Sequence, residues 1–140
     1  MIAAGLGVFD RTVHKTYEWL ADLMALLAVD DRQVAYQALR ATLHALRDRL
    51  TVEEVAQFGA QLPMLVRGFY YEGWDPTAKP LKLRHMEAFL AYIATEFNND
   101  AVDPEQAARA VFALLAQRVT AGEIEDVKHI LPAELRELWT

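Results

Sequence analysis

Histidine and carboxylate side chains are the groups in this sequence best suited to proton transfer or metal binding. The four histidines are His14, His44, His85 and His129. On a helix, side chains three or four positions apart share a face, which places His14 beside Glu18 and His129 beside Glu125 or Asp126. A stable metal site needs three or more convergent ligands, and neither pair supplies them. The pattern predicts solvated surface pairs, so we assign no metal ligand and no cofactor.

The nucleophiles that most hydrolases use are missing from the chain. It contains no cysteine and no serine, which excludes serine and cysteine hydrolases, thiolate metal sites and disulfide bonds. No glycine-rich phosphate-binding loop is present, so ATP and dinucleotide chemistry have no support. We therefore assign no catalytic residue and favour a protein that is not an enzyme. The lack of cysteine suits a reducing compartment, and residues 1–10 do not resemble a secretory signal, so we expect a cytoplasmic location.

The charge of the chain argues against nucleic acid and membranes as partners. The net charge is −6 and the pI is near 5.1, so the average field repels phosphate backbones and anionic lipids. No stretch approaches the roughly 20 apolar residues of a membrane span. One short basic run contains Lys79, Lys82, Arg84 and His85. We interpret it as a solvated connection, because nucleic-acid-binding modules spread positive charge over a whole face.

The strongest pattern in the sequence is an internal repeat. Residues 38–70 align without a gap on residues 107–139, with roughly ten identities in about thirty positions. The recurring pairs include Arg40 and Arg109, Arg49 and Arg118, Thr51 and Thr120, Glu54 and Glu123, Leu62 and Leu131, Pro63 and Pro132, and Arg67 and Arg136. One interpretation is that the charged pairs line a groove for an anionic ligand. Recurrence favours a structural role instead, with each arginine bonded to a carboxylate or to helix-end carbonyls.

The recurring residues also predict where helices begin and end. Thr51 followed by Glu54 predicts a capping box, in which the hydroxyl and the carboxylate each satisfy a backbone amide, and Thr120 with Glu123 repeats it. Each Leu-Pro pair then ends that helix, and its proline starts a short last one. We expect these last helices over residues 64–71 and 133–139.

Amphipathic patterns supply the remaining helices. Apolar residues recur near the helical spacing over residues 13–27, 34–50, 86–97 and 108–119. Asp103 and Pro104 fit the N-cap and first position of the last of these. The sequence therefore predicts an all-α fold of about eight helices, arranged as two similar four-helix units in one compact domain. The first unit is residues 1–72, the linker is 73–82, and the second unit is 83–140.

Four aromatic residues lie close together around the start of the linker. They are Phe69, Tyr70, Tyr71 and Trp74. Aromatic side chains with a polar tip suit protein contacts, so this cluster is the candidate partner-binding surface. The alternative is that the cluster cements the two units, since Tyr70 aligns with Trp139 in the repeat. Tyr71 and Trp74 are the members we expect to be exposed.

Three segments resemble a known bacterial family. They are AYQALRATLHALRDRL at residues 35–50, QLPMLVRGFYYEGWDP at residues 61–76 and AGEIEDVKHILPAELRELW at residues 121–139. With their Leu-Pro-x-x-x-Arg and Gly-Glu-x-x-Asp-Val elements, they are similar to the family called domain of unknown function 2267, and the resemblance covers nearly the whole chain. It implies a helical fold of tandem units in a bacterial protein. It implies no catalytic residue and no cofactor.

The first functional hypothesis is a non-enzymatic helical interaction module that binds a protein partner or a second copy of itself. The second is a small-molecule or metal-binding protein with a site between the two helical units. The third is a weak nucleic-acid binder that uses the basic linker.

Overall fold

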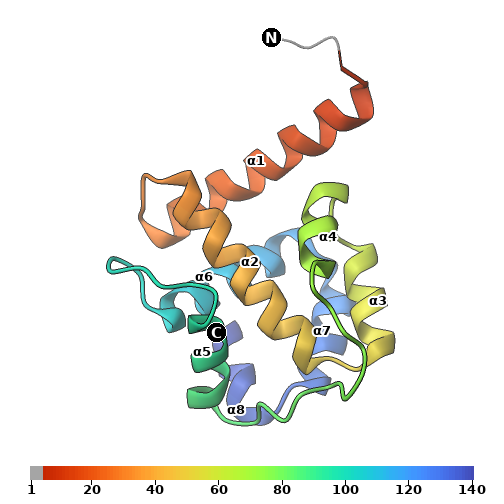
Figure 1. Ribbon diagram of the computed structural model, residues 1–140, viewed down its shortest axis with the longest axis vertical. Helices are drawn as coiled ribbons and strands as arrows, with labels where there is room; N and C mark the ends of the chain where they lie inside the picture. The colour runs from red at the N-terminus through yellow and green to blue at the C-terminus, as the bar shows by residue number, and fades with distance from the viewer. Residues whose placement is uncertain (1–4) are drawn as a thin grey trace.

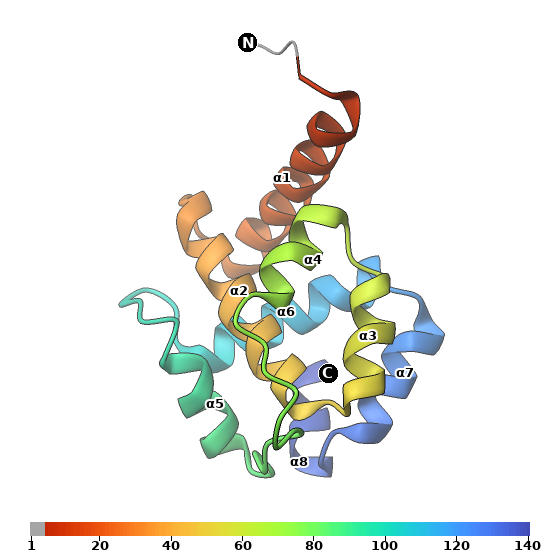
Figure 2. The ribbon, with the colours of Figure 1, turned by 45° about the vertical axis from the view of Figure 1, so that its right-hand side comes forward.

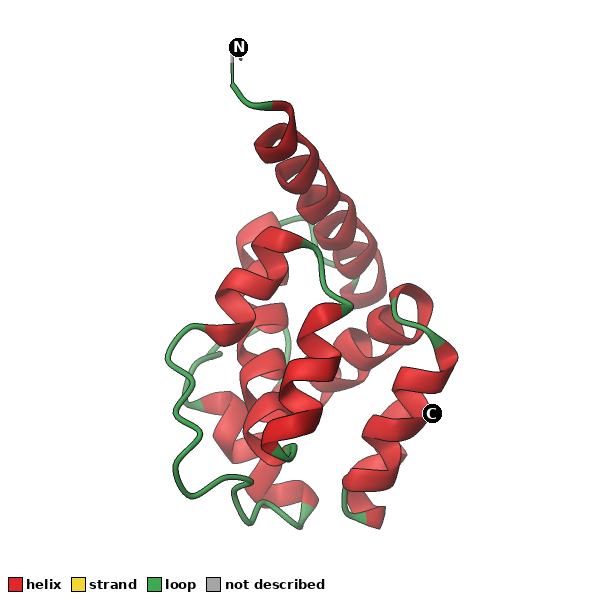
Figure 3. Cartoon of the chain, turned by 90° about the vertical axis from the view of Figure 1, so that its right-hand side faces the viewer, coloured by secondary structure: helices red, strands yellow, loops and turns green. Residues whose placement is uncertain are grey.

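The computed structural model describes residues 5–140, and every regular element within them is a helix (Figure 3). In chain order these are α1 (Gly7–Leu27), α2 (Arg32–Arg49), α3 (Val52–Ala60), α4 (Met64–Tyr71), α5 (Met86–Ala94), α6 (Pro104–Arg118), α7 (Ala121–Ile130), α8 (Ala133–Arg136) and a short 3-10 helix, η1 (Glu137–Trp139) (Figure 1). The predicted all-α class is confirmed over this range. None of the described helices combines the length and the hydropathy that crossing a bilayer requires.

Helix α2 runs through the centre of the molecule and contacts α1, α4, α5 and α6 (Figure 2). Every residue from Ala41 to Asp48 is buried, so two turns of this helix are covered on all sides. Alanines make up much of the buried surface of both α2 and α6. Small side chains at the contact let the two helix axes lie close together.

The other helices pack around this central pair. Helix α6 contacts α1 and α5 as well as α2, and η1 packs on α6. Helices α3 and α7 lie side by side (Figure 2). Helix α1 is buried only from Thr16 to Leu27, and its N-terminal half projects away from the remaining helices (Figure 1).

Side-chain caps fix several helix starts where the sequence predicts them. The Asp103 carboxylate accepts a hydrogen bond from the Gln106 backbone amide at 2.8 Å, and the Gln106 side-chain oxygen accepts one from the Asp103 backbone amide at 3.3 Å. Pro104 follows as the first helical residue, where its missing N–H removes no hydrogen bond. This complete capping box starts α6.

The capping boxes predicted at Thr51 and Thr120 form only in part. Each hydroxyl accepts a hydrogen bond from the amide of the glutamate three residues later, at 3.3 and 3.4 Å. Within the described residues, neither Glu54 nor Glu123 bonds the threonine amide, and the Thr120 amide bonds the Gln61 side chain instead. The carboxylate half of the prediction is wrong because the packing of α3 on α7 buries both glutamate side chains against each other.

Two recurring arginines bond the end of the helix before them. Arg67 donates to the Leu62 carbonyl at 2.7 Å, and Arg136 donates to the Leu131 carbonyl at 3.0 Å. Each arginine also bonds a carbonyl in the last turn of the preceding helix, at 2.9 and 2.8 Å. The last carbonyls of a helix have no N–H donor four residues later in the same helix. The guanidinium groups donate to them instead and stabilise the Leu-Pro corner.

The last predicted helix, over residues 133–139, is divided into α8 and η1. The Glu137 carbonyl accepts bonds from the Thr140 amide at 3.2 Å and from Arg109 at 2.9 Å. Bonds of the i to i+3 kind tighten a final turn from α-helix to 3-10 helix. The aligned segment of the first half continues as the α-helix α4 up to Tyr71.

Ala28 ends α1 in a left-handed conformation, with φ of 57° and ψ of 46°. This conformation costs a residue with a Cβ about 1 kcal/mol relative to glycine. We predict that Ala28→Gly raises the free energy of unfolding by about 0.5–1 kcal/mol in urea denaturation. Ala25→Gly, at an exposed position inside the same helix, is the matched control and should lower it by about 1 kcal/mol. Destabilisation by both substitutions would contradict this reading of the α1 terminus.

Candidate functional site

A buried polar network extends from one face of α2. The His44 ring is almost completely buried. Its Nε2 bonds the Phe69 carbonyl at 2.7 Å, and its Nδ1 faces the Glu96 carboxylate at 2.9 Å. The Phe69 carbonyl and the Glu96 carboxylate are both hydrogen-bond acceptors, so each ring nitrogen of His44 faces an acceptor. His44 therefore joins α2 to α4 and to the residues after α5.

The same network continues one turn further along α2. Arg47 donates to the Tyr70 carbonyl at 2.7 Å, to the Glu72 carbonyl at 3.0 Å and to the Asp48 carboxylate at 2.7 Å. The Tyr92 hydroxyl of α5 donates to Asp48. Burial, and then the bond to Asp48, raises the pKa of Tyr92 to about 12. Both buried charges are paired, so this region stabilises the fold and offers no free group for chemistry.

The six recurring arginines do not converge on one groove. Their bonded partners are Glu72 and Glu96 for Arg40, Glu105 for Arg109, Asp22 for Arg118, and helix-end carbonyls for Arg67 and Arg136. Arg49 has a buried Nε without a hydrogen-bond partner among the described residues. These contacts are spread over different faces and different helices, which gives no common site for an anion.

The four aromatic residues around the start of the linker pack inward to different degrees. Tyr70 is completely buried, and its hydroxyl donates to the Val55 carbonyl at 2.8 Å. Its ring lies 4.9 Å from that of Tyr71, which in turn lies 5.8 Å from Trp74. Tyr71 and Trp74 are half-buried against the core. Tyr70 is therefore out of reach of a partner, while Phe69 lies on the wall of a groove.

The histidine pairs near the surface make local contacts. His14 lies 3.1 Å from the Glu18 carboxylate, and both side chains are exposed. His129 bonds the backbone carbonyl of Glu125 at 2.8 Å rather than its carboxylate. His85 of the basic run pairs with Glu134 at 3.2 Å. The pairing predicted from the spacing forms between His14 and Glu18, whereas His129 bonds a backbone carbonyl and His85 meets a residue from another part of the chain.

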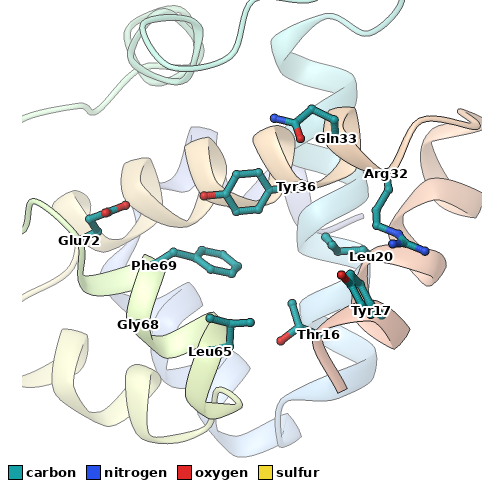
Figure 4. Close-up of a pocket in the computed structure, with 10 residues that line it drawn as sticks. All are labelled: Thr16, Tyr17, Leu20, Arg32, Gln33, Tyr36, Leu65, Gly68, Phe69 and Glu72. Carbon is teal, nitrogen blue, oxygen red and sulfur yellow. The ribbon is translucent and has the colours of Figure 1, made fainter. Parts of the chain in front are cut away.

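An open groove of about 570 Å³ lies between α1, α2 and α4 (Figure 4). Its lining residues are Thr16, Tyr17, Leu20, Arg32, Gln33, Tyr36, Leu65, Gly68, Phe69 and Glu72. The rings of Tyr36 and Phe69 meet edge to face at 5.3 Å on one wall. On the other side, the Arg32 guanidinium lies 4.2 Å from the centre of the Tyr17 ring. The groove is thus apolar inside with charged groups at its rim.

The projecting half of α1 extends one wall of this groove. Thr12 marks the junction with α4, because its hydroxyl accepts a hydrogen bond from the Leu65 amide at 2.9 Å. On either side of Thr12 along the helix, Phe9 is 56 % exposed and Val13 is 40 % exposed. Phe9, Val13 and Leu20 follow the helical spacing of one face. The apolar stripe that buries the second half of α1 therefore continues past the body without a partner in the described chain.

A second candidate site lies where α3 meets α7. Glu54 is 6 % exposed and Glu123 is 8 % exposed, and oxygens of both come within 4.8 Å of each other and of the exposed Asp126 carboxylate. One oxygen of each glutamate is buried without a hydrogen-bond partner in residues 5–140. Burial, followed by the hydrogen bond to Glu123, raises the pKa of Glu54 to about 8. Near neutral pH the Glu54 carboxyl therefore keeps its proton.

The sequence does not reveal this meeting of carboxylates. The repeat marks Glu54 and Glu123 as equivalent positions. The capping pattern gives each of them a role at the start of its own helix and predicts no contact between them. Their contact depends on how α3 packs against α7, which no short-range pattern specifies. The recurrence of an acidic residue at the same position of both halves is the one signal that points toward it.

The raised pKa of Glu54 predicts a pH dependence of stability. In the unfolded chain the carboxyl loses its proton near pH 4.5, whereas in the folded protein it keeps the proton to about pH 8. The protonated Glu54 carboxyl makes its full contribution to the free energy of unfolding below pH 4.5. This contribution is lost as the pH rises through about 8, by at most about 1.4 kcal/mol per pH unit. We predict that Glu54→Gln removes this loss and is more stable than the wild type at pH 8.5.

Urea denaturation of both proteins across this pH range, in buffer with EDTA, measures the effect. Glu53→Gln on the exposed side of α3 is the control and should follow the wild type. If the free energies of unfolding of the wild type and Glu54→Gln differed by the same amount at every pH, folding would not change the pKa of Glu54.

Comparison with known proteins agrees with the sequence resemblance. The family described as "Uncharacterized conserved protein (DUF2267)" matches residues 16–138. The match begins at Thr16, the first buried residue of α1, so the projecting stripe lies before it. No curated protein matches the chain.

Proposed function

Since the chain belongs to the DUF2267 family, whose description names no activity, we propose a function from its geometry: a non-enzymatic helical interaction module of the cytoplasm that pairs with a second copy of itself. The observation that carries this proposal is the apolar stripe of α1, which leaves the body beside an apolar groove of about 570 Å³. Within the described chain, no apolar surface covers the stripe and no side chain fills the groove.

A symmetric pair of chains covers both surfaces at once. An amphipathic helix binds a partner by laying its apolar face into a hydrophobic groove. In a two-fold dimer, Phe9 and Val13 of each copy enter the groove of the other, against Tyr36, Leu65 and Phe69. Phe69 keeps the partner-binding role expected from the sequence, with a second copy of the chain as the partner.

Charge at the edges of the two surfaces supports this arrangement. Asp10 lies one helical turn from Val13, beside the apolar stripe, and Arg32 stands at the rim of the groove. Neither side chain forms an ion pair within residues 5–140. When Val13 of one copy occupies the groove, Asp10 of that copy reaches the rim where Arg32 of the other stands.

The dimer is expected to be weak. Burying an apolar side chain of this size contributes about 1.5–3 kcal/mol when it starts fully exposed, and Phe9 and Val13 are already partly covered. Association costs several kcal/mol of rigid-body freedom. A Kd in the micromolar range or weaker follows, so self-association depends on concentration.

We predict that sedimentation equilibrium shows a monomer–dimer equilibrium that Phe9→Glu shifts to monomer. A charge at position 9 cannot enter the apolar groove without losing its hydration. The matched control is Val8→Glu, because Val8 is 40 % exposed and points to a different side of the same helix. The control should keep the wild-type dimer constant.

A charge exchange tests the register of the pair. Arg32→Glu and Asp10→Arg should each weaken the dimer, and the double variant should recover it. Trp74→Ala should not change the dimer constant. A dimer that Trp74→Ala disrupts and Phe9→Glu does not would show that the interface involves the half-buried aromatic residues instead.

A wild type that is monomeric at submillimolar concentration would refute self-association. A small apolar molecule would then be the ligand to test for the groove.

A further inference from the structure

The carboxylates between α3 and α7 lie apart from the proposed dimer surface, which involves α1, α2 and α4. Glu54 is the third residue of α3, Glu123 is the third residue of α7, and Asp126 follows one turn later on α7. All three carboxylate groups come within 4.8 Å of one another. Asp126 is exposed, so one side of the cluster is open to water.

The buried oxygens of this cluster lack the donors that buried acceptors normally have. Glu54 Oε2 and Glu123 Oε2 are fully covered and have no hydrogen-bond partner in the described chain. Leaving such a group unpaired destabilises the folded state, and more so when the group is charged. No lysine, arginine or histidine forms an ion pair with any of the three carboxylates among residues 5–140. The three carboxyl groups are thus gathered and partly desolvated without a basic side chain to pair with them.

The spacing of the oxygens suits a single hard cation. Two oxygens bound to the same Ca²⁺ at about 2.4 Å lie no more than about 4.8 Å apart, which is the limit that the three carboxylate groups satisfy. Carboxylate and water oxygens are ligands that Ca²⁺, Mg²⁺ and Mn²⁺ prefer, whereas zinc and copper favour nitrogen and sulfur. The chain offers no cysteine at all.

We propose that Glu54, Glu123 and Asp126 bind one hard divalent cation of the Ca²⁺ class between α3 and α7, with water filling its open side. The cation supplies the positive charge that the unpartnered glutamate oxygens lack. It also ties α3, in the first half of the chain, to α7, in the second half. Binding to the folded state alone stabilises that state, and this site does so independently of the α1 stripe and the groove.

Calorimetric titration and thermal unfolding of EDTA-treated, dialysed protein test this site with Ca²⁺, Mn²⁺ and Mg²⁺ as separate probes. We expect one Ca²⁺ per chain and a rise in Tm of roughly 5 °C or more at a concentration 100 times Kd. Glu54→Gln and Glu123→Gln keep the shape of the side chain and should each weaken binding at least tenfold. Glu53→Gln, one residue away on the exposed side, should bind as the wild type does.

Asp126→Asn is the variant to use if a substitution at a buried glutamate prevents folding, because Asp126 is exposed. This variant should also bind the cation at least tenfold more weakly than the wild type does. Two results would overturn the proposal. One is the absence of heat and of a Tm shift in the wild type at roughly 5 mM of each cation, above the weakest Kd values typical of protein Ca²⁺ sites. The other is equal loss of binding in Glu53→Gln and Glu54→Gln, which would indicate a nonspecific response to surface charge.

Discussion

The enclosure of α2 is the constraint on which the rest of the structure depends. Every residue from Ala41 to Asp48 is buried, yet this segment carries His44, Arg47 and Asp48. A buried charge left without partners destabilises a protein by several kcal/mol, and an unpaired buried polar group also destabilises it, so each of these side chains must be bonded. Their bonds reach the carbonyls of Phe69, Tyr70 and Glu72 and the side chains of Tyr92 and Glu96. Helix α2 therefore dictates where α4, α5 and the start of the linker lie.

This enclosure also indicates where function can reside. His44, Arg47 and Asp48 are bonded within the fold, and the recurring Arg67 and Arg136 are bonded to helix-end carbonyls. Two features lie apart from these bonded groups. One is the exposed apolar stripe of α1 at Phe9 and Val13, and the other is the pair of glutamates between α3 and α7. Local features that break the rules of a closed fold are where functional sites are expected, and both proposals rest on them.

Local patterns in the sequence predict the elements but not all of their contacts. The cap at Asp103, the corners at Leu62 and Leu131 and the eight helices follow from residues a few positions apart. The pairing of His44 with Glu96 joins positions 52 residues apart, and no spacing rule announces it. Helical periodicity identifies the stripe through Val13 and Leu20, but it does not show where the other helices stop covering it. The capping pattern places Glu54 and Glu123 correctly at helix starts, while the packing of α3 on α7 decides where their carboxylates point.

Hydrogen exchange measured by mass spectrometry at two protein concentrations tests the central claim, a closed body around α2 with an open apolar helix end. Amides of residues 41–48 should exchange only through global unfolding, at the same rate at both concentrations. Amides of residues 9–13 should exchange faster than these and become protected at the higher concentration, as the second copy covers them. Fast amide exchange in residues 41–48 would contradict the account. So would an exchange rate in residues 9–13 that is the same at both protein concentrations.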